Sequence, residues 1–432
     1  MPNPVRFTDD TRSLHKIGDV VMNFQPYQNA FINALVNRIG RVIITSKMWS
    51  NPLARFKKGK LDFGETIEEI FVNIAKPYSY DPNVSESEFM KQEIPDVRAV
   101  FHTMNYQKFY KSTIFNDQLR QAFMSWSAIE DLIAKIVDSM YTGMNKDEYL
   151  VTKYMVAREA LNGGFYTVTV SPIDGKNADP KNTVQYFREY SNNLTILSSE
   201  YNRAHVETAT EIQNQVIMMT NHAEAVIGVN VLADAFNMSQ VDYLGQRVLI
   251  DSFDFNESDK KRLAMLFAND PSYVPFTDAE IASLKAITGL KMDEDWFMIL
   301  DNFENFTQNY NGQGLYWNYW YHVWKTFSVS TFKNAVAFTT EAGSITAVAV
   351  TPKTATMAPG SSMTFTAAIN GNGLIDKSVT WAISGQTKSG TSIDPQSGTL
   401  HVARDEPRET SITVTATAVN GTAGTATVTV GE

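Results

Sequence analysis

The sequence predicts an α+β body followed by a separate all-β sandwich. Over the first 340 residues, candidate strands and helices alternate at irregular intervals. From Ser344 onward, seven short segments rich in Thr, Val and Ala are separated by Gly-containing breaks. Of the 50 aromatic residues, 48 precede this point, and only Phe365 and Trp381 follow it. This shift in composition predicts two domains, at 1–340 and 344–432.

The totals exclude several function classes. A net charge of −10 disfavours a general nucleic-acid binder. The absence of Cys excludes disulfides, thiol nucleophiles and Cys-ligated zinc. The six His never occur three or four residues apart, and GxxxxGK[ST], GxGxxG and GxSxG do not occur. We therefore expect no catalytic, cofactor or metal site, and no enzyme activity. We also expect no secretory signal and no membrane-spanning helix, because no suitable apolar run exists.

The first part of the body is predicted to contain a helix at 24–39, a strand at 41–45 and a hairpin over 55–74. The two halves of RFKKGKLDFGETIEEIFVNI resemble strands, with Gly59 and Gly64 permitting turns. One arm would carry cations and the other carboxylates: Arg55, Lys57, Lys58, Lys60 and Glu65, Glu68, Glu69. Two such surfaces on neighbouring copies would be complementary. Cross-strand pairing within the hairpin is the alternative.

Apolar residues spaced by three and four predict a long helix near 116–140 and a second helix at 146–161, which ends at Gly163–Gly164. A strand is expected at 165–170, and helices at 182–197 and 205–223. The stretch 228–301 should contain, in order, a helix at 230–236, a strand at 247–253, two polar-faced helices and a buried strand at 296–300.

The segment GLYWNYWYHVWKTF at 314–327 contains three Trp, three Tyr and one Phe. On a strand, Trp317, Tyr319 and Tyr321 would share one face, while Trp320 and Trp324 would share the other. Because both faces carry large aromatic side chains, we expect the strand to lie in a core or between subunits. An exposed platform for sugars is the alternative.

The C-terminal segments predict an immunoglobulin-like sandwich. Seven candidate strands lie within about 90 residues, and outward Thr alternates with inward Ala, Val and Ile. Phe365 and Trp381 are the predicted core aromatics. VAVTPKTATMAPGSSMTFTA, VTWAISG and IDPQSGTLHV resemble bacterial immunoglobulin-like domains of group 2.

Several motifs together resemble a known family. NPLARFKKGKLDFGETIEEIF, DYLGQRVLID, DEDWFMILDN and GLYWNYWYHVWKTFSVSTFKNAVAF occur in this order before the immunoglobulin-like segment. The chain thus resembles the major capsid protein of small short-tailed phages with protein-primed linear genomes, the Picovirinae or Salasmaviridae type.

The resemblance implies the tailed-phage capsid (Johnson) fold. An N-arm would occupy about 1–50, an extended E-loop about 52–72, and a spine helix 116–140. Peripheral and axial domains would follow, with the axial domain within 190–302. The stretch 254–292 is longer than this pattern predicts, so its contacts are an open question.

By the same resemblance, the protein would be a structural component of the virion, assembled in the host cytoplasm without a membrane. Hexamers and pentamers would form an icosahedral shell, with a scaffolding protein and a portal (connector) protein as partners. Packaged double-stranded DNA would be contacted non-specifically, and the immunoglobulin-like domain would brace the shell or bind host-surface glycans. Two alternatives remain: a bacterial surface adhesin, and a glycan-active protein using carboxylates such as Glu68–Glu69 or 293–295.

Overall fold

The computed structural model describes residues 49–61, 66–75, 77, 95–115, 126–175, 177–229 and 246–431, and side chains of the long helix from Asp138 onward. The predicted elements at 24–39, 41–45 and 230–236 lie outside these residues, as do 116–125. The chain divides into two compact units. The first contains 1–69, 100–152 and 297–329, and the second contains 70–99, 153–296 and 330–432.

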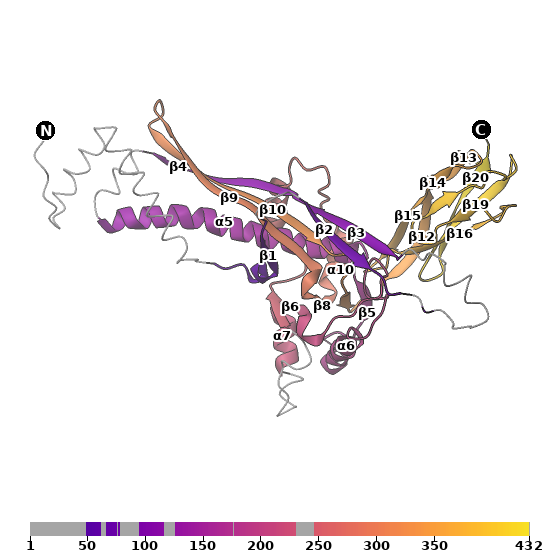
Figure 1. The fold of residues 1–432 in the computed structure, drawn as a ribbon. Coiled ribbons are helices and arrows are strands. Elements are labelled where there is room, and N and C mark those ends of the chain that lie inside the picture. Colours follow the sequence, from indigo (N-terminus) through magenta and orange to yellow (C-terminus); the bar gives the residue numbers. More distant parts are fainter. Residues whose placement is uncertain are drawn as a thin grey trace, which may run out of the picture. The chain divides into compact units, whose positions relative to one another are not determined.

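The first unit is built on a four-stranded sheet with the order β1-β9-β10-β4 (Figure 1). Its strands are β1 (Lys57–Lys60), β4 (Tyr106–Phe115), β9 (Phe297–Asn311) and β10 (Tyr316–Val329). β10 pairs antiparallel with both β9 and β4, and β1 pairs with β9 in parallel. The aromatic segment is therefore a strand, as predicted, and it is central in the sheet.

A single helix, α5 (Trp126–Leu161), replaces the two predicted helices. Its 36 residues extend about 54 Å at 1.5 Å per residue. The prediction of a break between 140 and 146 was wrong. A glycine inside a helix costs about 1 kcal/mol, and burial of Met140 and Met144 on both sides of Gly143 outweighs it. Both methionines pack against β10.

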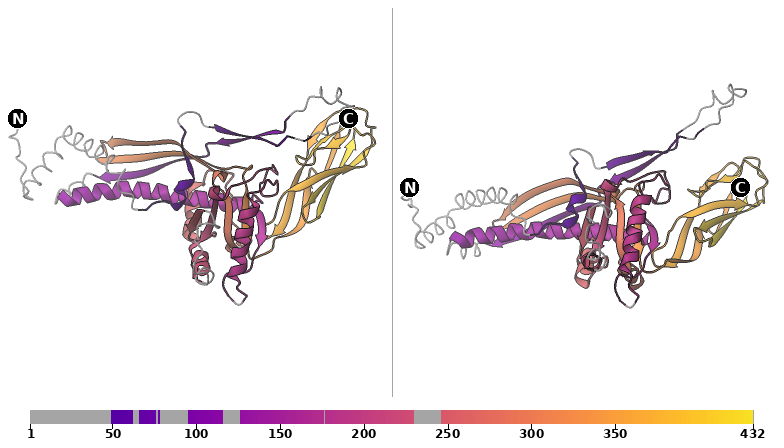
Figure 2. Two further views of the ribbon diagram at one scale, coloured as in Figure 1. Left: turned by 60° about the horizontal axis from the view of Figure 1, so that its bottom comes forward. Right: turned by 90° about the horizontal axis from the view of Figure 1, so that it is seen from below.

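The hairpin predicted over 55–74 is also wrong. β1 pairs with β9, whereas β2 (Thr66–Val72) pairs with β3 (Val97–Thr103) in a separate two-stranded sheet, here called the ribbon. Local packing explains why β1 pairs with β9. The short 3-10 helix η1 (Pro52–Phe56) precedes β1, and Phe56 stacks on Phe297 of β9 at 4.0 Å between ring centroids. Figure 2 shows β2 and β3 side by side.

The second unit contains a five-stranded sheet with the order β5-β11-β8-β6-β7. Its strands are β5 (Tyr166–Thr169), β6 (Gln215–Thr220), β7 (Gln246–Ile250), β8 (Ile287–Asp293) and β11 (Ala335–Thr339). Helices α6 (Pro180–Asn193) and α7 (Asn221–Ile227) pack with it.

Three predictions for this unit are confirmed: the strand at 165–170, the helix at 182–197 and the strand at 247–253. The helix predicted at 205–223 is wrong, because Ile212–Asn214 form a 3-10 turn and Gln215–Thr220 form β6. A short, wholly apolar run such as VIMM has no helical or strand period, so sequence alone does not distinguish the two.

The long stretch 254–292 forms the two predicted polar helices, α9 (Glu257–Leu266) and α10 (Asp278–Lys285), and then β8. Its aromatic residues surround cations of α5. The Arg158 guanidinium lies 4.1 Å from the centroid of Phe276 and donates to Glu280 at 2.7 Å. The stretch therefore packs against the C-terminal turns of α5, at Lys153, Tyr154 and Arg158.

From Ser344 the second unit continues as nine strands in three small sheets. All seven predicted segments contain strands, and Thr354–Met357 is an additional one. The strands are β12 (Ser344–Thr351), β13 (Thr354–Met357), β14 (Ser362–Thr364), β15 (Thr366–Asn372), β16 (Val379–Ser384), β17 (Ser392–Ile393), β18 (Thr399–His401), β19 (Ser411–Ala418) and β20 (Ala423–Val430). Phe365 and Trp381 lie in their common core.

Candidate subunit-contact surfaces

The predicted basic run does not act as one surface. Lys57 turns toward its own subunit, where its Nζ lies 2.8 Å from Glu148 of α5 and 3.1 Å from Asp301 of β9. Arg55, Lys58 and Lys60 have exposed side chains. The Arg55 guanidinium lies over the Phe56 ring at 5.5 Å. Lys57 is thus a cation of the predicted run that links β1 to α5 and β9 within the subunit.

Lys57 belongs to a buried charge cluster that sequence reasoning missed. Its central member is Lys325 of β10, which donates to Glu148 at 2.7 Å and also to Asp301. Burial alone would lower the pKa of Lys325, but the carboxylates of Glu148 and Asp301 raise it above its ordinary value. Burial would likewise raise the pKa of Asp301, but the ammonium groups of Lys325 and Lys57 lower it. Lys325 and Asp301 therefore stay ionised at neutral pH.

The cluster fixes the segment 51–60 to the sheet and to α5. Asn51, which caps η1, donates from Nδ2 to Glu148 at 2.9 Å. η1, β1, β9, β10 and α5 therefore converge on two carboxylates. No spacing rule in the sequence links residues 57, 148, 301 and 325, so this site required the fold.

The predicted hairpin carboxylates also differ in where they point: Glu69 contacts its own subunit and Glu68 faces outward. The Glu69 carboxylate lies 3.2 Å from Nε2 of His102. Nδ1 of the same ring lies 2.7 Å from Ser328 Oγ. His102 is 1% exposed, so one imidazole joins β2, β3 and β10. Glu68 points the other way and is exposed. Glu65 lies outside the described residues.

The outward side of the ribbon carries four large exposed apolar residues beside Glu68. Ile70 and Val72 are each 58% exposed, Val97 is 52% exposed and Phe101 is 62% exposed. A two-stranded sheet is marginally stable by itself in water. Exposed apolar side chains grouped in this way mark a surface for association.

The aromatic strand β10 presents two different faces. Trp317, Tyr319 and Tyr321 are buried against α5, and Tyr321 stacks on Tyr141 at 4.8 Å. Trp320 is half-buried and Trp324 is exposed on the opposite side. The first three residues are thus core, and the last two lie on the side of the sheet away from the core.

Strands β4 and β9 continue this second side, here called the open face. Register places Phe115 beside Tyr316, Lys111 beside Trp320, and Phe109 beside His322. On the same face, Phe303 of the neighbouring strand β9 lies beside Trp324, with ring centroids 4.7 Å apart. The alternation of YQKFYKSTIF in β4 was the signal that sequence reasoning did not use.

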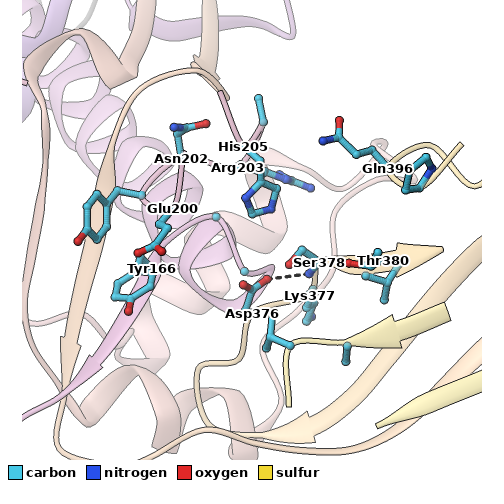
Figure 3. A pocket seen from close by; sticks show the side chains of 18 of the residues that line it. Tyr166, Glu200, Asn202, Arg203, His205, Asp376, Lys377, Ser378, Thr380 and Gln396 are labelled. Atoms are coloured by element: carbon cyan, nitrogen blue, oxygen red, sulfur yellow. Dashed lines mark hydrogen bonds between the residues drawn. The ribbon is translucent and has the colours of Figure 1, made fainter. Parts of the chain in front are cut away.

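A polar cavity of about 1240 Å³ lies within the second unit. Figure 3 shows Glu200, Arg203, His205, Asp376 and Gln396 around it. Asp376 accepts from the backbone N–H of Ser378 at 2.7 Å. Because the lining mixes both signs of charge, it does not indicate one class of ligand.

In the part of the chain that the structure describes, no group of three or more His, Asp or Glu side chains is arranged to hold a metal ion. None of the described helices combines the length and apolarity needed to cross a membrane.

A family model described as Phi29-like phage major capsid protein matches residues 8–339. The chain belongs to this family. The major capsid protein of Bacillus phage B103 is 35% identical over 430 residues, covering 98% of this chain and 88% of the relative. That of Bacillus phage PZA is 34% identical over 423 residues, covering 96% and 86%.

Solved structures agree on the fold. A chain from the capsid structure of Staphylococcus phage Andhra has a TM-score of 0.52 at 16% identity, covering 68% of this chain and 85% of its own. A chain from the structure of head fiber and inner core protein gp22 of bacteriophage P68 has a TM-score of 0.54 at 14% identity, with the same coverages. The body of this capsid protein therefore has a tailed-phage capsid fold.

This phage major capsid protein is a structural component of the virion, and it assembles with copies of itself. The alternative of a bacterial surface adhesin has no support among the comparisons. The exposed ribbon and the open face are therefore candidate surfaces for contact between copies.

Proposed function

We propose that copies of this capsid protein form an icosahedral shell of hexamers and pentamers around the double-stranded DNA of a tailed phage. The observation that carries the proposal is the ribbon, whose outward residues Ile70, Val72, Val97 and Phe101 are each more than half exposed in a single copy. Burying them against neighbours would stabilise the shell by about 25 cal/mol per Å² of apolar surface.

In this proposal the ribbon extends the E-loop beyond 52–72, to Thr103 at the end of β3. The segment near Lys57 is its fixed base, and β2 and β3 lie on a neighbouring copy. The net charge of −10 fits a container, because a strongly basic lining would bind the packaged phosphates. We propose a scaffolding protein and a portal (connector) protein as assembly partners, on the basis of the family, with assembly in the host cytoplasm.

The first test is electron microscopy of negatively stained protein, expressed with and without its scaffolding partner. Shells, tubes or hexameric rings are expected. A 48 kDa monomer under all assembly conditions would contradict the proposal.

We further propose that residues 344–432 form an immunoglobulin-like domain of group 2, which faces outward and braces the shell or binds host-surface glycans weakly. Its nine strands around Phe365 and Trp381 support this assignment. β11 is complete at Thr339, where the family match also ends.

A chain that ends at Glu341 should therefore still form shells. The measurement is particle yield by sedimentation and microscopy, compared with the full chain. Loss of particles, while the truncated chain keeps the helical content of α5 and α6 by circular dichroism, would show that the C-terminal domain is needed for assembly.

A further inference from the structure

Arg98, the second residue of β3, forms hydrogen bonds with three separate segments of the second unit. Its Nη1 donates to the backbone carbonyl of Ala204 at 2.6 Å, and its Nη2 donates to the Gln396 side chain at 3.2 Å. The Asp96 carboxylate accepts from Nε at 3.4 Å and from Nη2 at 3.2 Å. One planar guanidinium therefore joins the start of β3, a loop of the body and the C-terminal domain proposed above.

The acceptor in the body is held in place by its own backbone contacts. Asn202 is buried and exchanges two hydrogen bonds with the Val206 backbone, at 2.7 and 2.9 Å. The backbone N–H of Ala204 donates to the carbonyl of Thr331 at 3.0 Å. The position of the Ala204 carbonyl is therefore fixed independently of Arg98.

The acceptor in the C-terminal domain lies on an equally rigid turn, within the motif IDPQSGTLHV. Asp394 Oδ1 accepts from the backbone N–H groups of Gln396 and Ser397, at 2.9 and 2.7 Å. Gly398 ends the turn with a φ of +69°, and a Cβ added there would lie 2.7 Å from the Trp381 ring. The turn is therefore packed against the core of the domain, and the backbone of Gln396 moves with the whole domain.

A second contact with the C-terminal domain lies at the end of α5 and leaves no room for side chains. Gly163 follows α5 with a φ of +77°, and a Cβ added there would lie 2.7 Å from the backbone nitrogen of Lys377. Gly343 lies directly before β12, and a Cβ added there would overlap the carbonyl oxygen of Leu374. Backbone therefore packs directly on backbone at both glycines.

The two contacts line the same polar cavity of about 1240 Å³, one at Gly163 and Lys377 and the other at Arg98 and Gln396. A cavity of this size leaves room for movement that a close-packed contact would not allow. The hydrogen bonds of a partly exposed guanidinium contribute little individually, because water replaces them readily. The contact at Gly163 therefore suits a pivot, whereas the contact at Arg98 suits a latch that opens.

We propose that Arg98 is a latch, which locks the C-terminal domain to the body and couples it to the start of β3. When the latch is open, the domain pivots about Gly163 and Gly343. Asn73, directly after β2, donates to the Asp96 carboxylate at 3.3 Å, so the latch acts on both strands of the ribbon. The device lies within one copy of the protein, so it does not depend on the proposed shell.

The test measures the distance between the body and the C-terminal domain in the unassembled full chain. Because the chain has no Cys, Gln185→Cys on α6 and Thr427→Cys on β20 introduce one pair of sites for spin labels, both exposed. Double electron–electron resonance then reports the distribution of distances between the labels. A closed latch predicts a single narrow distribution.

Gln396→Ala removes only the acceptor in the C-terminal domain, and Arg98→Lys keeps the charge but loses the planar fork of donors. Each should at least double the width of the distribution, while Gln396→Glu, which keeps an acceptor, should leave it narrow. Gln396 is exposed, so these changes should leave the fold intact. Arg203→Ala is the matched control, because Arg203 lines the same cavity but donates to Glu159 of α5 at 2.9 Å. An unchanged width in either Gln396→Ala or Arg98→Lys, or a wide distribution in the unsubstituted chain, would overturn the latch.

An added methyl group tests the pivot. Gly343→Ala places a Cβ against the Leu374 carbonyl, so the mean distance between the labels should shift although Arg98 is intact. Gly228→Ala is the control, because nothing lies within 4 Å of its added Cβ. The same mean distance in Gly343→Ala as in the unsubstituted chain would exclude this glycine as part of the pivot.

Hydrogen exchange tests the coupling to the ribbon. In Gln396→Ala, exchange should rise severalfold at residue 73 and at 96–99, because the guanidinium of Arg98 then lacks its acceptor in the C-terminal domain. Arg203→Ala should leave exchange at these residues unchanged. Unchanged exchange there in Gln396→Ala, with a widened distance distribution, would overturn the coupling to β3.

Discussion

Among the described residues, each of the two units buries one lysine completely, with opposite consequences. Lys325 in the first unit and Lys291 on β8 of the second are both 0% exposed. Lys325 is surrounded by carboxylates, which raise its pKa. The Lys291 ammonium donates to the backbone carbonyl of Phe187 at 3.1 Å, and burial lowers its pKa to about 7. Burial alone therefore does not set the charge of a lysine, because the partners that the fold supplies decide it.

The difference has a structural consequence for a shell protein. The charge of Lys325 holds β9, β10 and α5 together, and Lys57 of β1 binds the same two carboxylates. Lys291 lies among the apolar residues of the five-stranded sheet, where a charge weakens the fold. The first unit thus uses a buried charge to position a segment, while the second has a titratable group within its core.

The largest effect is expected for Lys325→Met. This change leaves the buried Glu148 carboxylate paired with Lys57 but without Lys325, and breaking a buried ion pair from one side costs about 3–5 kcal/mol. Chemical denaturation of the unassembled subunit should show this loss, and hydrogen exchange should locate it in the first unit. Lys333→Met, at a partly exposed lysine with ion-pair distances of 3.8 to 3.9 Å, is the control. A loss below 1 kcal/mol would mean that the cluster does not depend on Lys325.

Lys291→Met is expected to raise stability, whereas Lys325→Met lowers it. Removing a lone buried amine and keeping its apolar stem should stabilise the second unit by about 1–2 kcal/mol at pH 7. A destabilised variant would show that the hydrogen bond to Phe187 outweighs the burial of the amine, and the contrast between the two lysines would then fail.

The same lysine predicts a pH dependence. Its folded pKa of about 7 lies below the unfolded value of about 10.4, so the unfolded chain binds more protons between these values. Stability should therefore rise as pH increases from 7 toward 10 and fall as pH decreases through this window. Thermal unfolding across this range measures the slope, which should be smaller in Lys291→Met. Equal slopes in the two proteins would assign the titration to another group.

Much of this fold was predictable because local patterns determine it. The alternation of polar and apolar residues, with many β-branched side chains, located all seven C-terminal segments. Large aromatic side chains on both faces of 316–324 predicted a strand that is covered on both sides, and this strand is central in its sheet. Order of motifs then indicated the family. Boundaries failed where tertiary packing overrode a local signal, as at Gly143 inside α5 and at the buried run of β6.

The candidate site was less predictable, because its parts are distant in sequence. The cations at 55–60 looked like one surface, yet Lys57 bonds to residues 91 and 244 positions away, at Glu148 and Asp301. The partner strand of β2 lies beyond residue 95, and no local pattern specifies such a pairing. The open face needed the register of β4 and β9 against β10 before its aromatic side chains could be grouped.

The smallest effect is expected for Lys57→Met, and it separates positioning from stability. The Lys57 side chain is 22% exposed, and Lys325 still compensates Glu148 and Asp301, so the loss of stability should be about 1 kcal/mol or less. Hydrogen exchange should nevertheless increase across residues 52–60 relative to Lys60→Met, because Lys57 is the tie between β1 and α5. If exchange in this segment is unchanged, packing of Phe56 on Phe297 is sufficient to fix the base of the ribbon. Lys57 would then add charge balance without positioning the segment.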